Sequence, residues 1–362
     1  MRIGYGVASA ALFLSLLVTA AAPGKAESAG TLLQIQPAFA PLAYSGKVYL
    51  FNSAGRLEVV PLEGKAASAV SDLPAAPILP PVSTPGGPCF MDGQGRLWNA
   101  ASAPPSLISS PGPGAVALVP TDGRPAVVYP DRLILPDGRS VALPLRTKGA
   151  VQLSDGGYWI YGDHGAARLD AKGAALWTWT SETLRPTTAC LAGNSIYSGT
   201  QNGIFAALRA KNGKTRWRYP AGGPIEDVVP VEPRRVLFSC SDHYLRCLWT
   251  RRGQLAWQVR VPGRVISPLV LCQGGKAFLA AASGARRLSM YSFAGGKMLW
   301  TWEAPSGEIL LPPVVSDGKA AVVVLTSQNH PLLFRLPLPA PDQSSSGKKA
   351  GAGAATGAEA EP

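Results

Sequence analysis

Short apolar runs alternate with turn-forming residues along most of the chain, in the pattern of a β-meander. Between residues 158 and 302 one unit occurs four times: a β-prone run, a polar or glycine turn, a second run, a Lys/Arg-Gly turn, and a third run that carries a tryptophan. The segment before each unit supplies a fourth run, so the pattern predicts four-stranded antiparallel sheets. The copies are YWIYGDHGAARLDAKGAALWTW from Tyr158, SIYSGTQNGIFAALRAKNGKTRWRY from Ser195, RVLFSCSDHYLRCLWTRRGQLAWQV from Arg235 and AFLAAASGARRLSMYSFAGGKMLWTW from Ala277.

In every copy the tryptophan follows a glycine by four residues, and successive copies are 40, 40 and 43 residues apart. A repeat of this length is typical of a propeller blade, which must stack on its neighbours to bury its faces. One aromatic residue per blade at a fixed register is what repeated docking requires, so we expect the tryptophans to be largely buried between blades. A stacking platform for a ligand is the alternative. The pairs are Gly173 and Trp177, Gly213 and Trp217, Gly253 and Trp257, and Gly296 and Trp300.

Eight hairpin turns along the chain predict an all-β, eight-bladed β-propeller of four-stranded blades over residues 30–338. The first three units lack the tryptophan and are rich in proline, which suits edge strands and loops. The eighth unit has too few residues for its last strand, and we expect residues 31–36 (TLLQIQ) to supply it and close the ring. Seven blades with one appended hairpin remain the alternative.

Two segments, LDAKGAALW (Leu169 to Trp177) and ALRAKNGKTRW (Ala207 to Trp217), resemble the PQQ-type β-propeller repeat, and the resemblance covers roughly residues 150–305. That family includes quinone-dependent dehydrogenases and the non-enzymatic outer-membrane barrel assembly factor BamB. The dehydrogenases carry two adjacent cysteines beneath the cofactor, ligands for calcium and a catalytic aspartate. The five cysteines of this chain include no adjacent pair. The resemblance therefore implies the non-enzymatic branch.

The two ends of the chain differ from the repeats. Residues 1–26 combine an early Arg2, an apolar run from Val7 and small residues at cleavage positions, which predicts a secretory signal peptide. A retained membrane anchor is the alternative. No cysteine precedes Cys89, so we expect an exported, periplasmic or extracytoplasmic protein that is not a lipoprotein and keeps no transmembrane segment after cleavage. Residues 339–362 form a low-complexity tail that we expect to be disordered.

The chain carries 34 basic against 22 acidic residues, and residues 204–297 account for this excess with sixteen basic and four acidic side chains. Equivalent turns of a propeller lie on one rim, so cations in these turns predict a basic surface for an anionic partner: lipid headgroups, an acidic protein loop or an anionic polymer. A solvated rim that protects strand edges is the alternative. No nucleic-acid motif accompanies the charge. The candidate cations are Lys172, Lys211, Lys214, Arg251, Arg252 and Lys297.

Cys240 and Cys247 flank the turn SDHYLR, and a hairpin centred on His243 and Tyr244 predicts that they lie opposite each other and form a disulfide. The three histidines, His164, His243 and His330, fall in turns of separate units, so we expect no metal site.

The chain has no nucleophile elbow, phosphate loop or calcium-loop motif, so we expect neither catalysis nor a cofactor. These observations together predict an exported, non-catalytic propeller that acts as a protein-interaction scaffold in the cell envelope, with outer-membrane protein assembly as the specific version. The partner would be an envelope protein, through an acidic loop or as part of a membrane-associated complex. The alternatives are a quinone-dependent or other small-ligand enzyme and a glycan- or anionic-polymer-binding propeller.

Overall fold

The structure is a computed structural model that describes residues 31–62, 68–180, 185–231, 234–272, 275–282, 286–304, 308–309, 311–316, 320–326 and 331–339. The predicted signal peptide (1–26), His330, and all of the predicted tail except Pro339 lie outside these ranges. In the described part of the chain there is no helix long and apolar enough to cross a membrane.

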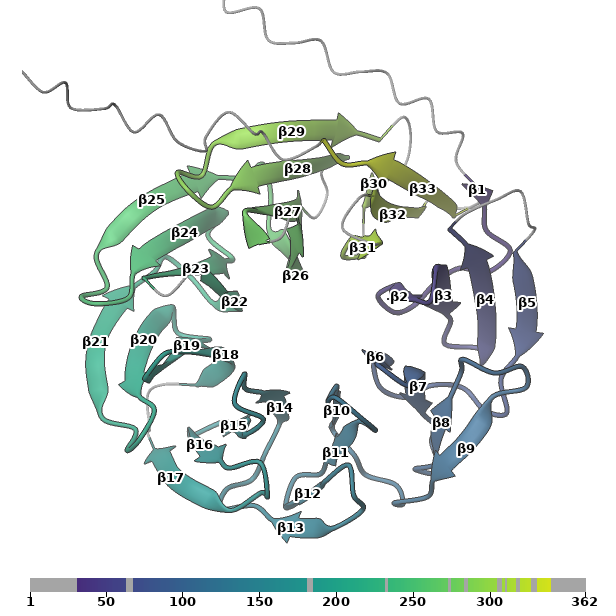
Figure 1. The fold of residues 1–362 in the computed structure, drawn as a ribbon, viewed down its shortest axis with the longest axis horizontal. Coiled ribbons are helices and arrows are strands. Elements are labelled where there is room, and N and C mark those ends of the chain that lie inside the picture. Colours follow the sequence, from purple (N-terminus) through teal and green to yellow (C-terminus); the bar gives the residue numbers. More distant parts are fainter. Residues whose placement is uncertain are drawn as a thin grey trace, which may run out of the picture.

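The described strands form eight antiparallel sheets arranged as blades around a central opening (Figure 1). In each blade the first strand lines the opening and the last strand lies at the outer edge (Figure 1). Blades one to four consist of β2 (Leu42–Tyr44), β3 (Lys47–Phe51), β4 (Arg56–Pro61) and β5 (Ala69–Asp72); β6 (Val82–Thr84), β7 (Gly87–Met91), β8 (Leu97–Asn99) and β9 (Ser106–Ser109); β10 (Ala117–Val119), β11 (Ala126–Val128), β12 (Arg132–Ile134) and β13 (Ser140–Ala142); and β14 (Gly149–Gln152), β15 (Tyr158–Gly162), β16 (Gly165–Leu169) and β17 (Ala175–Thr180).

The remaining blades confirm the predicted number of eight, and the alternative of seven blades is wrong. Blades five to eight consist of β18 (Pro186–Ala192), β19 (Ser195–Thr200), β20 (Ile204–Arg209) and β21 (Thr215–Pro220); β22 (Ile225–Val231), β23 (Arg235–Cys240), β24 (Tyr244–Trp249) and β25 (Leu255–Arg260); β26 (Val265–Cys272), β27 (Ala277–Ala282), β28 (Arg287–Ser292) and β29 (Met298–Glu303); and β30 (Glu308–Ile309) with β31 (Val314–Ser316), β32 (Ala320–Thr326), β33 (Leu332–Pro337) and β1 (Thr31–Leu32).

The ring closes through the N-terminal strand, as the sequence predicts. β1 pairs antiparallel with β33, with Thr31 opposite Leu333 and Leu32 opposite Leu332. The strand is shorter than the predicted 31–36, because the chain then leaves blade eight and runs to blade one. Leu33 and Ile35 are buried on this path, in the core between the two blades. The closure therefore joins both ends of the propeller in one blade.

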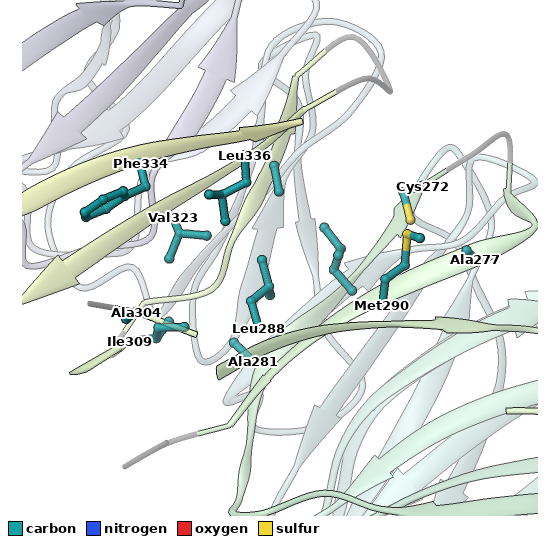
Figure 2. Packing of buried hydrophobic residues seen from close by; sticks show 12 residues of the cluster. Cys272, Ala277, Ala281, Leu288, Met290, Ala304, Ile309, Val323, Phe334 and Leu336 are labelled. Atoms are coloured by element: carbon teal, nitrogen blue, oxygen red, sulfur yellow. The ribbon is translucent and has the colours of Figure 1, made fainter. Parts of the chain in front are cut away.

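The hydrophobic core is divided among the blade interfaces, with one buried cluster of described residues at each of the eight. Strand periodicity explains this division, because successive side chains of a strand point to opposite faces. On β20, Phe205 and Ala207 pack toward blade six, whereas Ala206 and Leu208 pack toward blade four. Figure 2 shows the interface of blades seven and eight, where Leu288 and Met290 of one blade lie near Val323, Phe334 and Leu336 of the other. Each blade is thus apolar on both faces.

The predicted disulfide between Cys240 and Cys247 is wrong, because all five cysteines are free thiols in the structure. The turn between β23 and β24 contains three residues rather than a symmetric pair, so Cys240 lies opposite Tyr244 and Cys247 lies opposite Leu237. His243 completes this tight turn with a φ of 71°. The two thiols consequently point to opposite faces of the blade, Cys240 toward blade five and Cys247 toward blade seven.

Candidate functional site: the turn face of blades four to seven

The repeated tryptophans join each blade to the next by a hydrogen bond. The indole nitrogen of Trp177 donates to the Ala210 carbonyl oxygen at 2.7 Å, Trp217 donates to that of Thr250 at 2.8 Å, and Trp257 donates to that of Phe293 at 3.0 Å. Each acceptor lies in the turn between the third and fourth strands of the following blade. Three of the predicted tryptophans therefore dock onto their neighbours.

The repeated glycines supply the room for this docking. A Cβ atom on Gly213 would lie 2.5 Å from Cε3 of Trp177, and the Gly253 and Gly296 positions are closed in the same way by Trp217 and Trp257. The glycine and the tryptophan of one repeat therefore do not contact each other. Each of these three glycines contacts the tryptophan of the preceding blade.

The ends of the series differ, because blade three has no docking tryptophan. Gly173 instead faces Val141, whose Cγ2 would lie 2.9 Å from an added Cβ. Trp300 packs against the cluster between blades seven and eight. All four repeated tryptophans are partly buried, and each lies on the outermost strand of its blade.

The docked turns share one face of the ring with the turns between the first and second strands. We call this the turn face. All six predicted cations are exposed on it, and further cations come from the adjacent turns and strand ends. Across the described turn-face residues of blades five to seven there is no acidic side chain. The additional cations are Arg209, Arg216, Arg234, Arg235 and Lys276.

Blade four marks the edge of this basic sector, because its acidic side chains on the turn face are engaged locally. Asp155 pairs with the Arg168 guanidinium. Asp170 accepts hydrogen bonds from the backbone N–H groups of Lys172 and Ala174 and so shapes its own turn. The charge of blades five to seven is therefore not neutralised from this side.

The turn face is hollowed beside blade six. A hollow of about 710 Å³ is lined by six residues, and Trp249 is the one aromatic among them. We call it the Trp249 hollow. Trp249 was not among the predicted site residues, although its position outside the repeated tryptophan register was a usable signal. The lining residues are Arg234, Trp249, Thr250, Arg251, Arg252 and Gln254.

A second turn-face hollow, of about 640 Å³, lies between blades four and five. Its cations include Lys211, Arg209 and Arg216, but Arg168 is already paired with Asp155. Arg216 also donates to the Ser195 hydroxyl at 2.7 Å. These contacts leave fewer unpartnered cations here than in the Trp249 hollow.

The opposite face carries a hollow of about 740 Å³ with mixed charge. Arg264 in its lining donates to Glu226 at 2.9 Å, so part of its charge is neutralised. The two faces of blades five to seven therefore differ in electrostatic character, and the basic one is the turn face.

The inner strand β22 carries a half-buried carboxyl group, that of Asp227. It accepts the Leu269 backbone N–H at 2.7 Å, which links blade six to blade seven. Burial raises the pKa of Asp227, and the hydrogen bonds from Leu269 and Val228 oppose that rise. His164 and His243 lie in turns of blades four and six, and the described residues contain no group of three His, Cys, Asp or Glu side chains arranged for a metal ion.

A family model described as outer membrane protein assembly factor BamB matches residues 95–229 and 162–265. No curated protein matches the chain significantly. The predicted PQQ-like repeat is therefore confirmed over these residues, and within them the chain is a PQQ-like repeat propeller.

Solved structures share the fold at low sequence identity. The computationally designed Ika8 protein has a TM-score of 0.67 at 10% identity, covering 82% of this chain and 95% of its own. Sqt1 of Saccharomyces cerevisiae has a TM-score of 0.65 at 12% identity, covering 85% of this chain and 98% of its own. The C-terminal WD40 domain of Sif2 has a TM-score of 0.63 at 11% identity, covering 85% and 99%. These likenesses establish the propeller fold alone.

Proposed function

We propose that this chain is a protein-interaction scaffold of the cell envelope whose docking surface is the turn face of blades five to seven. The observation that carries the proposal is the concentration of exposed cations on that face, with no acidic residue among its described neighbours. Such a surface attracts and orients an acidic partner. The propeller supplies a rigid support, since docked tryptophans fix the turns relative to each other.

The family match gives the specific version of this proposal. The matched family is described as an outer membrane protein assembly factor, so we propose assembly of outer-membrane proteins as the process served. Export through the predicted signal peptide (1–26) would bring the chain to that compartment. The partner would be an envelope protein that presents an acidic loop.

We also propose that the chain acts without catalysis. The residues that repeat most regularly are occupied in blade docking, and the sequence has no adjacent cysteine pair of the kind found in quinone-dependent dehydrogenases. Adding pyrroloquinoline quinone and calcium to purified protein should give no dye reduction with alcohols or sugars. Reduction above that of a heat-denatured sample would contradict this proposal.

The scaffold proposal is tested by a crosslinking pulldown from the native envelope with a charge-reversed variant. Changing Lys211, Lys214, Arg251 and Arg252 to Glu should abolish partner recovery. Thermal stability should stay nearly unchanged, because exposed charges contribute little to folding. A matched variant reverses four exposed cations elsewhere on the ring and should recover the partner as wild type does. Its substitutions are Lys47→Glu, Arg124→Glu, Arg146→Glu and Arg260→Glu.

Wild-type recovery should also weaken as salt rises from about 0.05 to about 0.5 M, because the Debye length shortens to a few ångströms over that range. Equal recovery by wild type and the turn-face variant, without salt dependence, would contradict the scaffold proposal.

A further inference from the structure

Trp249 is the one exposed tryptophan of the nine in the chain, all of which lie in the described residues. Its side chain is 44% exposed, although it ends a strand whose other apolar residues are buried. The equivalent position, four residues before the docking glycine, is Leu169 in blade four, Arg209 in blade five and Ser292 in blade seven. Blade docking therefore does not require tryptophan here, and the repeat gives no reason for it.

The indole of Trp249 is held by a neighbouring arginine. The Arg235 guanidinium carbon lies 5.6 Å from the centre of the Trp249 ring, within range of a cation–π contact. Arg235 in turn donates to the carbonyl oxygens of Phe293 at 3.1 Å and Ala294 at 2.8 Å, both in the docked turn of blade seven. These contacts fix the aromatic ring before any partner arrives.

Three cations surround this ring in the Trp249 hollow. Arg234, Arg251 and Arg252 are exposed, and no acidic side chain of the described residues pairs with any of them. Gln254 adds to the lining an amide group that forms hydrogen bonds to a polypeptide. An aromatic anchor flanked by guanidinium groups that have no acidic partner among the described residues is thus preformed on the proposed docking face.

We infer that the Trp249 hollow binds an acidic peptide segment in which one aromatic or large apolar side chain is flanked by carboxylates. Guanidinium groups form bidentate hydrogen bonds with carboxylates, and a preorganised tryptophan is a frequent hot spot of protein interfaces. The hollow favours a peptide over a membrane surface, because Trp249 lines a recess that a single side chain of a peptide can enter. This inference rests on the proposed function and names the contact that would give the turn face its specificity.

The test uses fluorescence anisotropy with the full chain and a labelled peptide of one phenylalanine between two pairs of glutamates. A matched peptide replaces the phenylalanine with serine. Trp249→Ala should weaken binding of the phenylalanine peptide at least about tenfold and leave the weak binding of the serine peptide unchanged. Arg251→Ala combined with Arg252→Ala should weaken both peptides, whereas Lys47→Ala combined with Arg124→Ala, two exposed cations outside the docking surface, should change either by less than about threefold.

The comparison of the two peptides needs no protein variant, so it stands even where a substitution impairs folding. Equal affinity for the two peptides, or equal binding by Trp249→Ala and wild type, would overturn the inference. So would Trp249-dependent sedimentation with phosphatidylglycerol vesicles combined with no peptide binding, which would assign the hollow to lipid. In the envelope pulldown, loss of recovery with the turn-face variant but not with Trp249→Ala would reject the hollow and keep the scaffold. Normal recovery with both would reject the scaffold as well.

Discussion

The indole of Trp177 occupies the space in which a side chain on Gly213 would lie, although the two residues belong to different blades. A Cβ atom on Gly213 would approach Cε3 of Trp177 to 2.5 Å, and the indole nitrogen donates to Ala210 three residues earlier. The same pairing recurs between Trp217 and Gly253 and between Trp257 and Gly296. The repeated glycine and tryptophan therefore mark the contacts between neighbouring blades.

This relationship predicts that Gly213→Ala destabilises the protein more than an alanine at a glycine with free space. Gly193 is the matched control, because it also has positive φ, 55° against 70° for Gly213, but nothing lies within 4 Å of an added Cβ. Gly193→Ala should cost about 1–2 kcal/mol from backbone conformation alone, and Gly213→Ala should cost a further ~1–3 kcal/mol from overpacking. Chemical denaturation measures both. Equal losses would contradict the docking contact.

A second prediction concerns the closure of the ring at Glu58. This side chain is fully buried, and its Oε2 accepts the backbone N–H groups of Gln34 at 2.8 Å and Ile35 at 3.1 Å. Glu58→Ala should cost roughly 1–3 kcal/mol, because the buried backbone N–H of Ile35 and the partly buried one of Gln34 lose their acceptor.

Glu58→Ala should destabilise the N-terminal segment before it causes global unfolding. Hydrogen exchange should accelerate at residues 31–35, whereas amides of blades four to six should keep their protection until global unfolding. Uniform acceleration across all blades, or none at residues 31–35, would contradict the conclusion that Glu58 holds the N-terminal segment in place.

The fold was predictable because every unit repeats the same local pattern. The eight hairpins predicted the blade number, and the shortage of residues after β33 required a strand from the other end, which β1 supplies. The hydrogen-bond partner of each tryptophan was less predictable. The repeat indicates that Trp177 contacts a neighbouring blade, but its acceptor, the Ala210 carbonyl oxygen, is fixed by how the blades assemble into the ring.

The candidate site was predictable only in part, for two physical reasons. Cations in equivalent turns gather on one face because the turns are equivalent, so Arg251 and Arg252 could be found from spacing. Trp249 was missed because the exposure of its side chain follows from how the blades pack, which spacing along the chain does not show. The Cys240 disulfide was wrong because one residue in the length of a turn moves a side chain to the other face of the strand.

The corrected cysteine assignment predicts five free thiols. Burial raises the pKa of the Cys89 and Cys272 thiols to about 11, so neither forms much reactive thiolate near neutral pH. Iodoacetamide should therefore label the native protein slowly and add five groups in denaturant without reductant, as counted by intact mass. Three added groups in denaturant, rising to five after reduction, would restore the Cys240–Cys247 disulfide.

The last prediction concerns Asp92, a fully buried carboxylate in the turn of blade two. It accepts hydrogen bonds from the side chains of Arg96 at 2.7 Å and Trp98 at 2.9 Å, and from two backbone N–H groups of its own turn. Burial alone would raise its pKa, but the Trp98 and Arg96 hydrogen bonds and the Arg96 charge outweigh burial and hold the pKa below the ordinary 3.8. The ionised form is therefore the one that stabilises the fold.

Asp92→Asn should cost roughly 2–4 kcal/mol near neutral pH. The substitution removes the negative charge, and the amide NH₂ group then faces the N–H donors that the carboxylate oxygens accept from. A lowered folded pKa contributes stability that is complete above the unfolded value of 3.8 and is lost as pH falls through the folded value. The difference between wild type and variant should thus be constant above about pH 5 and shrink below about pH 4. Asp137 is the matched control, since it accepts the backbone N–H and the Nε of Arg139 with a side chain that is 52% exposed, and Asp137→Asn should leave the unfolding midpoint nearly unchanged. Denaturant unfolding across this pH range measures both variants, and a difference at Asp92 that persists undiminished in acid would show that packing rather than charge explains it.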